Sequence, residues 1–405
     1  MSFSKKGNKP SPFIVFDIGS ASVGAALALA PNGKQVPQII YSTRVPIVAK
    51  NSRDHSRFIS AMLSALKNVA TDIEQDGIQK LSDNKLNAKD IKNIFCVMSS
   101  SWHKSSIEVF KKREEKPFIV SSKFISNMLE NADEQFLESI KNQPDNKKII
   151  NPRFIEKNII KILLNGYNTN EPKGKKVNSM DVALFMSVIS GEVSEKIENI
   201  LEKIFSVNSV SFHTFALSAF SVVRDIFSTE ENFLLMDISG ETTGITLVRN
   251  ETMVKDVDLP LGKNFLIEKV ASSLGTMHEE AHSLIRLFLE GKSISSETVK
   301  IEKVLVEARE EWLASFRKVL ADFSDGLSLP KTIFLTIDTD IGKWFVDTIK
   351  SDEFSAHTLA RQPFTIVELG SRILSKHCSV SQESPKGCDT FLGIDVIFAN
   401  KIANE

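Results

Sequence analysis

The chain has 405 residues, more than a single hydrophobic core usually organises, so two or more compact units are expected. Its 50 basic and 51 acidic side chains give a formal net charge of -1, which provides no overall field to attract nucleic acid or an anionic membrane. The three cysteines form no C-x-x-C pair, which argues against a disulfide framework or a zinc knuckle and fits a reducing cytoplasm. No run of about 18 apolar residues is present, so no membrane-spanning helix is expected.

The first predicted elements are three strands, over residues 13–16, 24–30 and 37–43. Residues 55–73 then carry apolar side chains at helical spacing, and a strand follows over residues 91–98. The opening unit therefore reads β-β-β-α-β.

The pattern changes between residues 99 and 190, where charged strands around a helix over residues 122–140 indicate a small inserted α+β domain. Helices over residues 192–205 and 216–227 then flank a strand over residues 209–212.

The strand pattern restarts with strands over residues 233–236, 245–248 and 251–258, and a helix begins near residue 265. The β-β-β-α order thus occurs twice, which indicates a duplicated fold.

Each repeat opens with an apolar strand, an aspartate and a turn of small and hydroxyl residues. The first turn follows Asp17 and the second follows Asp237. Small residues let backbone N–H groups approach phosphate oxygens closely, and an aspartate at a strand end can hold Mg²⁺ directly or through its waters. The pair of turns predicts a nucleotide held between two lobes.

Residues 13–24 (FIVFDIGSASVG) and 233–244 (FLLMDISGETTG) resemble the phosphate hairpins of the actin, Hsp70 and hexokinase-type ATPases, in particular FtsA and PilM. Residues 213–225 resemble the connecting helix of that family, and residues 258–288 resemble the segment after its second hairpin. Residues 163–174 resemble the NGY…P.G stretch of an SHS2-type module. The resemblance implies an α/β, actin-like (ribonuclease H-like) duplicated two-lobed ATPase fold with a small inserted α+β domain of SHS2 type.

On this basis the chain is expected to divide into five segments. They are the first part of the first lobe (1–91), the inserted SHS2-type domain (92–190), the second part of the first lobe (191–230), the second lobe (231–375) and a C-terminal segment that completes the fold (376–405).

The resemblance also implies a site for ATP and Mg²⁺ between the lobes. The residues expected to bind the nucleotide are Gly19, Ser20, Ala21, Ser22, Gly240, Thr242, Thr243 and Gly262. Asp17 and Asp237 are expected to hold Mg²⁺ through water. No catalytic residue is identified, and at most a weak ATPase activity is expected.

The function implied is that of a nucleotide-responsive cytoskeletal adaptor in cell division, and the alternative is a PilM-like cytoplasmic component of type IV pilus assembly. The expected partners are an FtsZ-type filament or the inner-membrane platform protein of a pilus, with self-association as a further option. Contact with the inner face of the membrane is expected only through partners, and no nucleic acid is expected to bind.

Three departures from the family pattern favour a further alternative, a scaffold of the same fold that binds no nucleotide. Ser239, Glu241 and Gly244 depart from the second hairpin. The strand over residues 334–340 lacks the glycines that admit adenosine, and residues 281–285 lack the acid and the lysine of the family's A-E-x-x-K motif.

Residues 278–282 read HEEAH, a literal H-E-x-x-H zinc-hydrolase motif. Against this reading, Thr276 and Glu279 have the spacing of a capping box, which would give Glu279 a structural task. A zinc hydrolase is therefore kept as a remote alternative.

Overall fold

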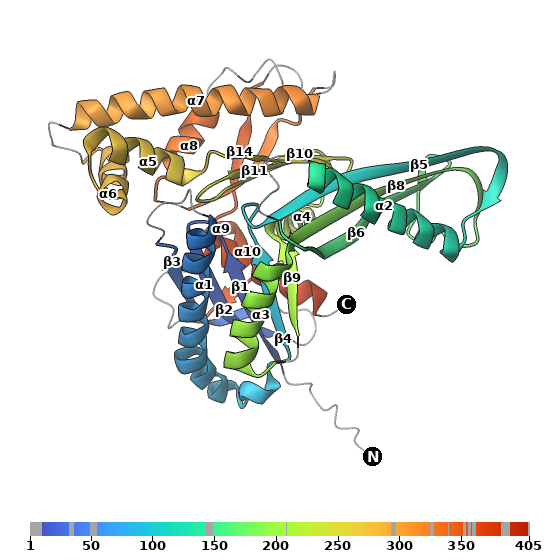
Figure 1. Ribbon diagram of the computed structural model, residues 1–405, viewed down its shortest axis with the longest axis horizontal. Helices are drawn as coiled ribbons and strands as arrows, with labels where there is room; N and C mark the ends of the chain where they lie inside the picture. Colours follow the sequence, from blue (N-terminus) through green and yellow to red (C-terminus); the bar gives the residue numbers. More distant parts are fainter. Residues whose placement is uncertain are drawn as a thin grey trace.

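The computed structural model describes residues 10–31, 36–48, 55–142, 149–207, 209–292, 297–324, 328–338, 340–350, 354, 358, 362–381 and 389–403. Within these residues the chain forms three sheets with helices packed around them (Figure 1). Cys388, His357 and most of the Pro31–Lys34 turn lie outside the described residues.

The first sheet has six strands in the order β15-β3-β2-β1-β4-β9. Their bounds are β1 (Ser11–Ile18), β2 (Ser22–Ala30), β3 (Gln38–Pro46), β4 (Asn93–Met98), β9 (Val210–Thr214) and β15 (Ser379–Val380). The strands β1, β2 and β3 are antiparallel neighbours, whereas β4 and β9 continue the sheet in parallel. The central strand β1 is apolar on both faces because both faces are covered.

The second sheet has five strands in the order β12-β11-β10-β13-β14. Their bounds are β10 (Phe233–Ile238), β11 (Thr243–Arg249), β12 (Thr252–Leu259), β13 (Thr332–Ile337) and β14 (Thr365–Glu368). Again an antiparallel three-stranded meander is followed by two parallel strands. The two sheets therefore share one topology, and the predicted duplicated α/β architecture is confirmed.

The third sheet has the order β5-β8-β6-β7, and its strands are β5 (His103–Ile119), β6 (Pro152–Leu164), β7 (Tyr167–Asn168) and β8 (Lys176–Ser190). Helix α2 (Ser122–Asn142) covers one face of it, and the unit projects from the two lobes (Figure 1). Because β4 pairs with β1 in the first sheet, the third sheet begins only after Met98, later in the chain than the boundary predicted at residue 92.

The remaining helices pack around the first two sheets. Around the first sheet lie α1 (His55–Asp72), α3 (Gly191–Phe205), α4 (Phe215–Ile226), α9 (Ser371–Leu374) and α10 (Thr390–Ile402). A π-helix over Ile73–Gly77 continues α1, and 3₁₀ helices follow over Ile78–Asn84 and Ala88–Asp90. Around the second sheet lie α5 (Lys263–Leu274), α6 (His278–Leu289), α7 (Thr298–Ser324) and α8 (Gly342–Ile349). None of the described helices is long and apolar enough to cross a membrane.

Side chains alternate between cores along the two central strands. Phe13 and Val15 of β1 share a core with Phe233 and Leu235 of β10, together with α4 and α10. Their strand neighbours face the outer core of each lobe instead. The two sheets therefore sandwich α4 and α10, and the hairpin turns at the ends of β1 and β10 approach each other.

Candidate functional site

The two hairpins that follow Asp17 and Asp237 have the same local geometry. Asp17 lies opposite Gly24 in the β1–β2 ladder, and Asp237 lies opposite Gly244 in the β10–β11 ladder. Each turn is closed by one backbone bond, from Gly19 N to the Ser22 carbonyl at 3.1 Å and from Ser239 N to the Thr242 carbonyl at 3.0 Å.

The tips of the two hairpins touch directly. The Ser20 Oγ lies 3.1 Å from the Ser239 Oγ and accepts a hydrogen bond from the Glu241 backbone N–H at 2.9 Å. Beside them Gly240 packs so closely that a Cβ on it would lie 2.7 Å from the Ala21 nitrogen. Ser20 is only 1% exposed, so the contact is buried. The structure therefore brings the predicted residues of the two turns together, and they contact one another directly.

The other predicted residues of the second turn also have partners within the protein. The Thr242 Oγ1 lies 2.8 Å from the Ser100 Oγ, and the Thr243 hydroxyl donates to the Leu261 carbonyl at 2.8 Å. A Cβ on Gly262 would lie 2.4 Å from the Gly240 carbonyl oxygen. Gly262 therefore serves the close packing of α5 beneath the turn.

The Asp17 carboxylate pairs with a guanidinium. Arg44, on β3, donates to Asp17 at 2.6 Å, to Asp389 at 2.6 and 3.0 Å, and to the Ser22 hydroxyl at 2.9 Å. Burial raises the pKa of Asp17 to about 6 although Arg44 opposes the rise. Burial would also raise the pKa of Asp389, but Arg44 outweighs it and holds that pKa below its usual range.

Sequence reasoning missed both Arg44 and Asp389. In the sequence, the glycine at position 24 hints at a close neighbour. The structure shows that this neighbour is Arg44, because a Cβ on Gly24 would lie 2.7 Å from the guanidinium.

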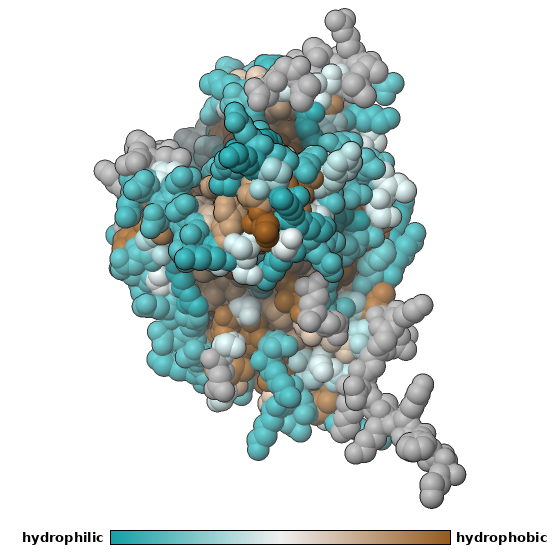
Figure 2. Space-filling view, turned by 90° about the vertical axis from the view of Figure 1, so that its right-hand side faces the viewer, coloured by the Kyte–Doolittle hydropathy of each residue, from teal (hydrophilic) through white to brown (hydrophobic). Residues whose placement is uncertain are grey.

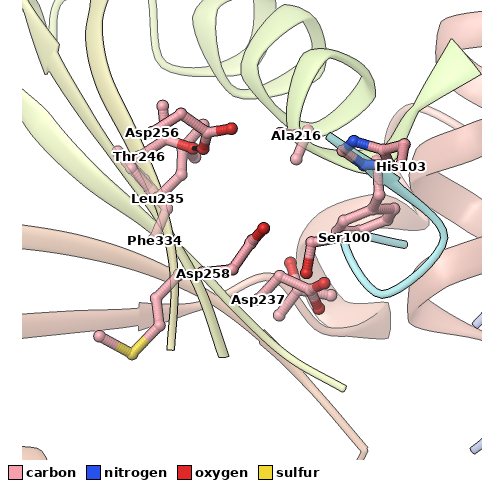
Figure 3. Close-up of a pocket in the computed structure, with 14 residues that line it drawn as sticks. Ser100, His103, Ala216, Leu235, Asp237, Thr246, Asp256, Asp258 and Phe334 are labelled. Atoms are coloured by element: carbon pink, nitrogen blue, oxygen red, sulfur yellow. Dashed lines mark hydrogen bonds between the residues drawn. The ribbon is translucent and has the colours of Figure 1, made fainter. Parts of the chain in front are cut away.

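Asp237 is the second predicted Mg²⁺ residue, and among the described residues no cation contributes to the shift of its pKa. Its Oδ1 is buried and has no hydrogen-bond partner within the described part of the chain. Its pKa is raised well above the usual value by burial and then by Asp17, Asp338 and Asp258. In Figure 3 Asp237 and Asp258 point into the same cavity.

That cavity lies between the second sheet, α4 and the start of β5, and it measures about 30 Å³. His103 closes it opposite Asp256 and Asp258 (Figure 3). Burial, helped by Lys104, lowers the pKa of His103 to about 3, so the imidazole is neutral. Burial and the neighbouring Asp256 raise the pKa of Asp258 to about 7.

A second ionic network occupies the side where the family pattern would admit adenosine. Lys263 contacts Asp338 and Asp340, and the His282 Nε2 lies 2.8 Å from Asp340. Burial would lower the pKa of Lys263, but the two carboxylates outweigh it and raise the pKa. The basic groups of this cleft are thus paired with carboxylates of the same chain.

The H-E-x-x-H motif has no third metal-binding side chain beside it in the part of the chain that the structure describes. Helix α6 begins at His278 with Met277 as its N-cap, and no side chain caps it, so the predicted capping box is wrong. His282 pairs with Asp340, as described above. No group of three or more metal-binding side chains is placed to hold a metal among the residues that the structure describes.

The geometry does not fit Mg²⁺-ATP. The two cavities at the hairpins measure about 20 and 30 Å³, enough for a water molecule but not for a nucleotide. Asp17, Asp237 and Asp338 line the smaller cavity, and their carboxylates would repel phosphate. Arg44, the basic residue in that lining, is already engaged with Asp17 and Asp389.

Comparison with solved structures identifies the architecture. A structure of the PilM–PilN type IV pilus biogenesis complex matches with a TM-score of 0.64 at 13% sequence identity, covering 96% of this chain and 98% of that one. This chain has an actin-like fold. A Bacteroides thetaiotaomicron protein of actin-like ATPase fold and unknown function matches more loosely, with a TM-score of 0.43, 8% identity and 98% and 99% coverage. No family model matches the sequence, and no curated protein matches it.

Proposed function

We propose that this chain is a PilM-like scaffold, an actin-fold protein of the cytoplasm that binds a protein partner at the membrane platform of a type IV pilus. The observation that carries the proposal is the similarity over the whole chain, 96% of it, to the structure of the PilM–PilN complex. The match includes the inserted unit as well as the two lobes.

The surface of the inserted unit supports a role in protein binding. Four large apolar side chains stand out from it, at exposed fractions of 51% for Val109, 62% for Ile119, 40% for Ile159 and 79% for Tyr167. Figure 2 shows the side of the molecule on which this unit lies, where hydrophobic residues gather near the centre and in a hollow below it while hydrophilic residues cover most of the rest. The four lie on both faces of the third sheet, since Val109 pairs with Ala183 whereas Ile159 pairs with Leu184, which faces α2. Each is therefore a separate candidate contact for a protein partner.

The experiment measures binding of the full chain to a PilN-type protein by isothermal titration calorimetry. We expect binding, and we expect Tyr167→Ser and Ile119→Ser to weaken it, since each removes an apolar contact. The matched control is Val299→Ser on α7, because the exposed fraction of Val299, 74%, lies between those of Ile119 and Tyr167 but Val299 belongs to the second lobe.

The same titration with an FtsZ-type protein tests the division role expected from the sequence. Binding to the FtsZ-type protein but not to the PilN-type protein would reject the pilus role. The chain would then be a scaffold protein of a division filament.

A further inference from the structure

We infer that the two lobes of this protein are latched shut by their own side chains, so that the closed arrangement needs no nucleotide. The hairpin tips make this contact whichever partner the protein binds.

The first part of the latch is the Ser20 hydroxyl. It meets the Ser239 hydroxyl and the Glu241 N–H across the lobe boundary, at 3.1 and 2.9 Å. Backbone N–H groups of such a turn are the donors that would otherwise face a phosphate. In this chain the Glu241 N–H is satisfied by a hydroxyl of the opposite lobe.

A second row of hydroxyl contacts runs beside the first. Ser100 and Ser101, which follow β4, place their hydroxyls 2.8 and 3.3 Å from the Thr242 Oγ1. At the start of β5, Ser105 donates to Asp256 of β12 at 2.6 Å. Together these bonds connect both the first lobe and the inserted unit to the second lobe.

Steric fit completes the latch. Gly240 lies against Ala21, and a Cβ on Gly240 would lie 2.7 Å from the Ala21 nitrogen and 2.8 Å from its Cβ. The neighbouring Gly244 belongs to the same hairpin, but a Cβ there would meet its nearest atom, an oxygen of Asp258, only at 3.8 Å. The hairpin therefore contains one glycine on which closure depends and one on which it does not.

Charge inside the cleft agrees with a closure that excludes nucleotide. Arg44 is held by Asp17 and Asp389, and Lys263 by Asp338 and Asp340. A triphosphate entering the cleft would have to displace these carboxylates from Arg44 and Lys263. Each new ion pair with phosphate would then replace an ion pair that the protein already has.

The test compares wild type, Gly240→Ala and Gly244→Ala by small-angle X-ray scattering and hydrogen exchange, each with and without Mg-ATP. Gly240 has no positive φ, so the alanine is strained only by the clash with Ala21. We expect Gly240→Ala to enlarge the radius of gyration and speed exchange in both hairpins, while Gly244→Ala behaves as wild type. Mg-ATP should change none of the three.

Compaction or added protection of wild type on addition of Mg-ATP would overturn the inference, and so would a folded Gly240→Ala protein that stays as closed as wild type. If Gly240→Ala fails to fold, Ser20→Ala keeps the packing and removes only the hydroxyl bonds. It should accelerate exchange of the Glu241 amide roughly tenfold, as the loss of one hydrogen bond allows. Unchanged exchange would refute the latch. The partner titration is a separate experiment, so failure of either proposal leaves the other standing.

Discussion

Removal of Arg44 should destabilise the first lobe in a way that depends on pH. The guanidinium is the cation that compensates Asp17, whose side chain is 4% exposed, and it also bridges to Asp389. Removing one partner of a buried ion pair costs about 3–5 kcal/mol because the other charge stays buried. We therefore expect Arg44→Ala to lower the free energy of unfolding by about 3 kcal/mol at pH 8.

The sign of the pH dependence follows from the raised pKa of Asp17. In the folded protein that pKa is about 6 against 3.8 for the ordinary group, so the folded state binds more protons between these values. Stability of the wild type therefore falls as the pH rises through about 4 to 6, by about 3 kcal/mol for a change of this size. Without Arg44 the pKa of Asp17 rises further. The stability gap between wild type and variant should thus be smaller at pH 5 than at pH 8, because the part due to Asp17 grows as Asp17 ionises while the part due to Asp389, whose pKa Arg44 holds below its usual range, is present at both.

Urea unfolding followed by circular dichroism at pH 5 and pH 8 measures the gap. The double variant Arg44→Ala/Asp17→Asn carries no buried charge at position 17 and should recover much of the loss at pH 8. Lys401→Ala is the control, because it breaks an exposed pair with Asp225 and should cost less than about 1 kcal/mol. A loss for Arg44→Ala that is below about 1 kcal/mol, or equal at the two pH values, would refute the reasoning.

Three further outcomes are expected. Glu156→Gln should lower stability by about 1–3 kcal/mol and speed exchange at the start of α4, because the buried carboxylate accepts bonds from the Thr214 N–H and hydroxyl; unchanged exchange there would contradict this. Gly262→Ala should destabilise the protein by about 1–3 kcal/mol, because the new Cβ would clash with the backbone of Ser239 and Gly240. Gly370→Ala is the control, since a Cβ there meets no neighbouring atom within 4 Å, and it should leave the melting temperature unchanged. Equal melting temperatures for the two variants would contradict the packing argument. Asp258→Asn should be more stable than wild type at pH 8 and equally stable near pH 4. The reason is that the pKa of Asp258 in the folded wild type is raised to about 7, so wild-type stability falls as the pH rises between those values. A variant less stable than wild type at pH 8 would show that the pKa of Asp258 is not raised.

The duplicated hairpins could be predicted because their chemistry is local. An apolar strand, an aspartate and a turn of small residues are contiguous in sequence, and the second copy repeats the pattern. The structure places Asp17 and Asp237 at equivalent positions of the two ladders.

The content of the cleft could not be predicted in the same way. Arg44 meets Asp389 only because the C-terminal helix α10 returns to the first sheet, and Ser20 meets Glu241 only because the two lobes fold onto each other. Turn motifs and hydrophobic periodicity report only local structure, so they cannot predict contacts between residues this far apart in the sequence. The Thr276 capping box shows the reverse error, because a local motif was present and the helix began without using it.

The position of α10 sets an order of events during synthesis. The strands of the second sheet run from Phe233 to Glu368 in one continuous stretch, so that sheet can assemble as soon as this stretch has left the ribosome. The first sheet, although five of its six strands emerge earlier, waits for β15 to pair with β3 and for Asp389 at the start of α10 to reach Arg44. The part of the protein that is made first is therefore completed last.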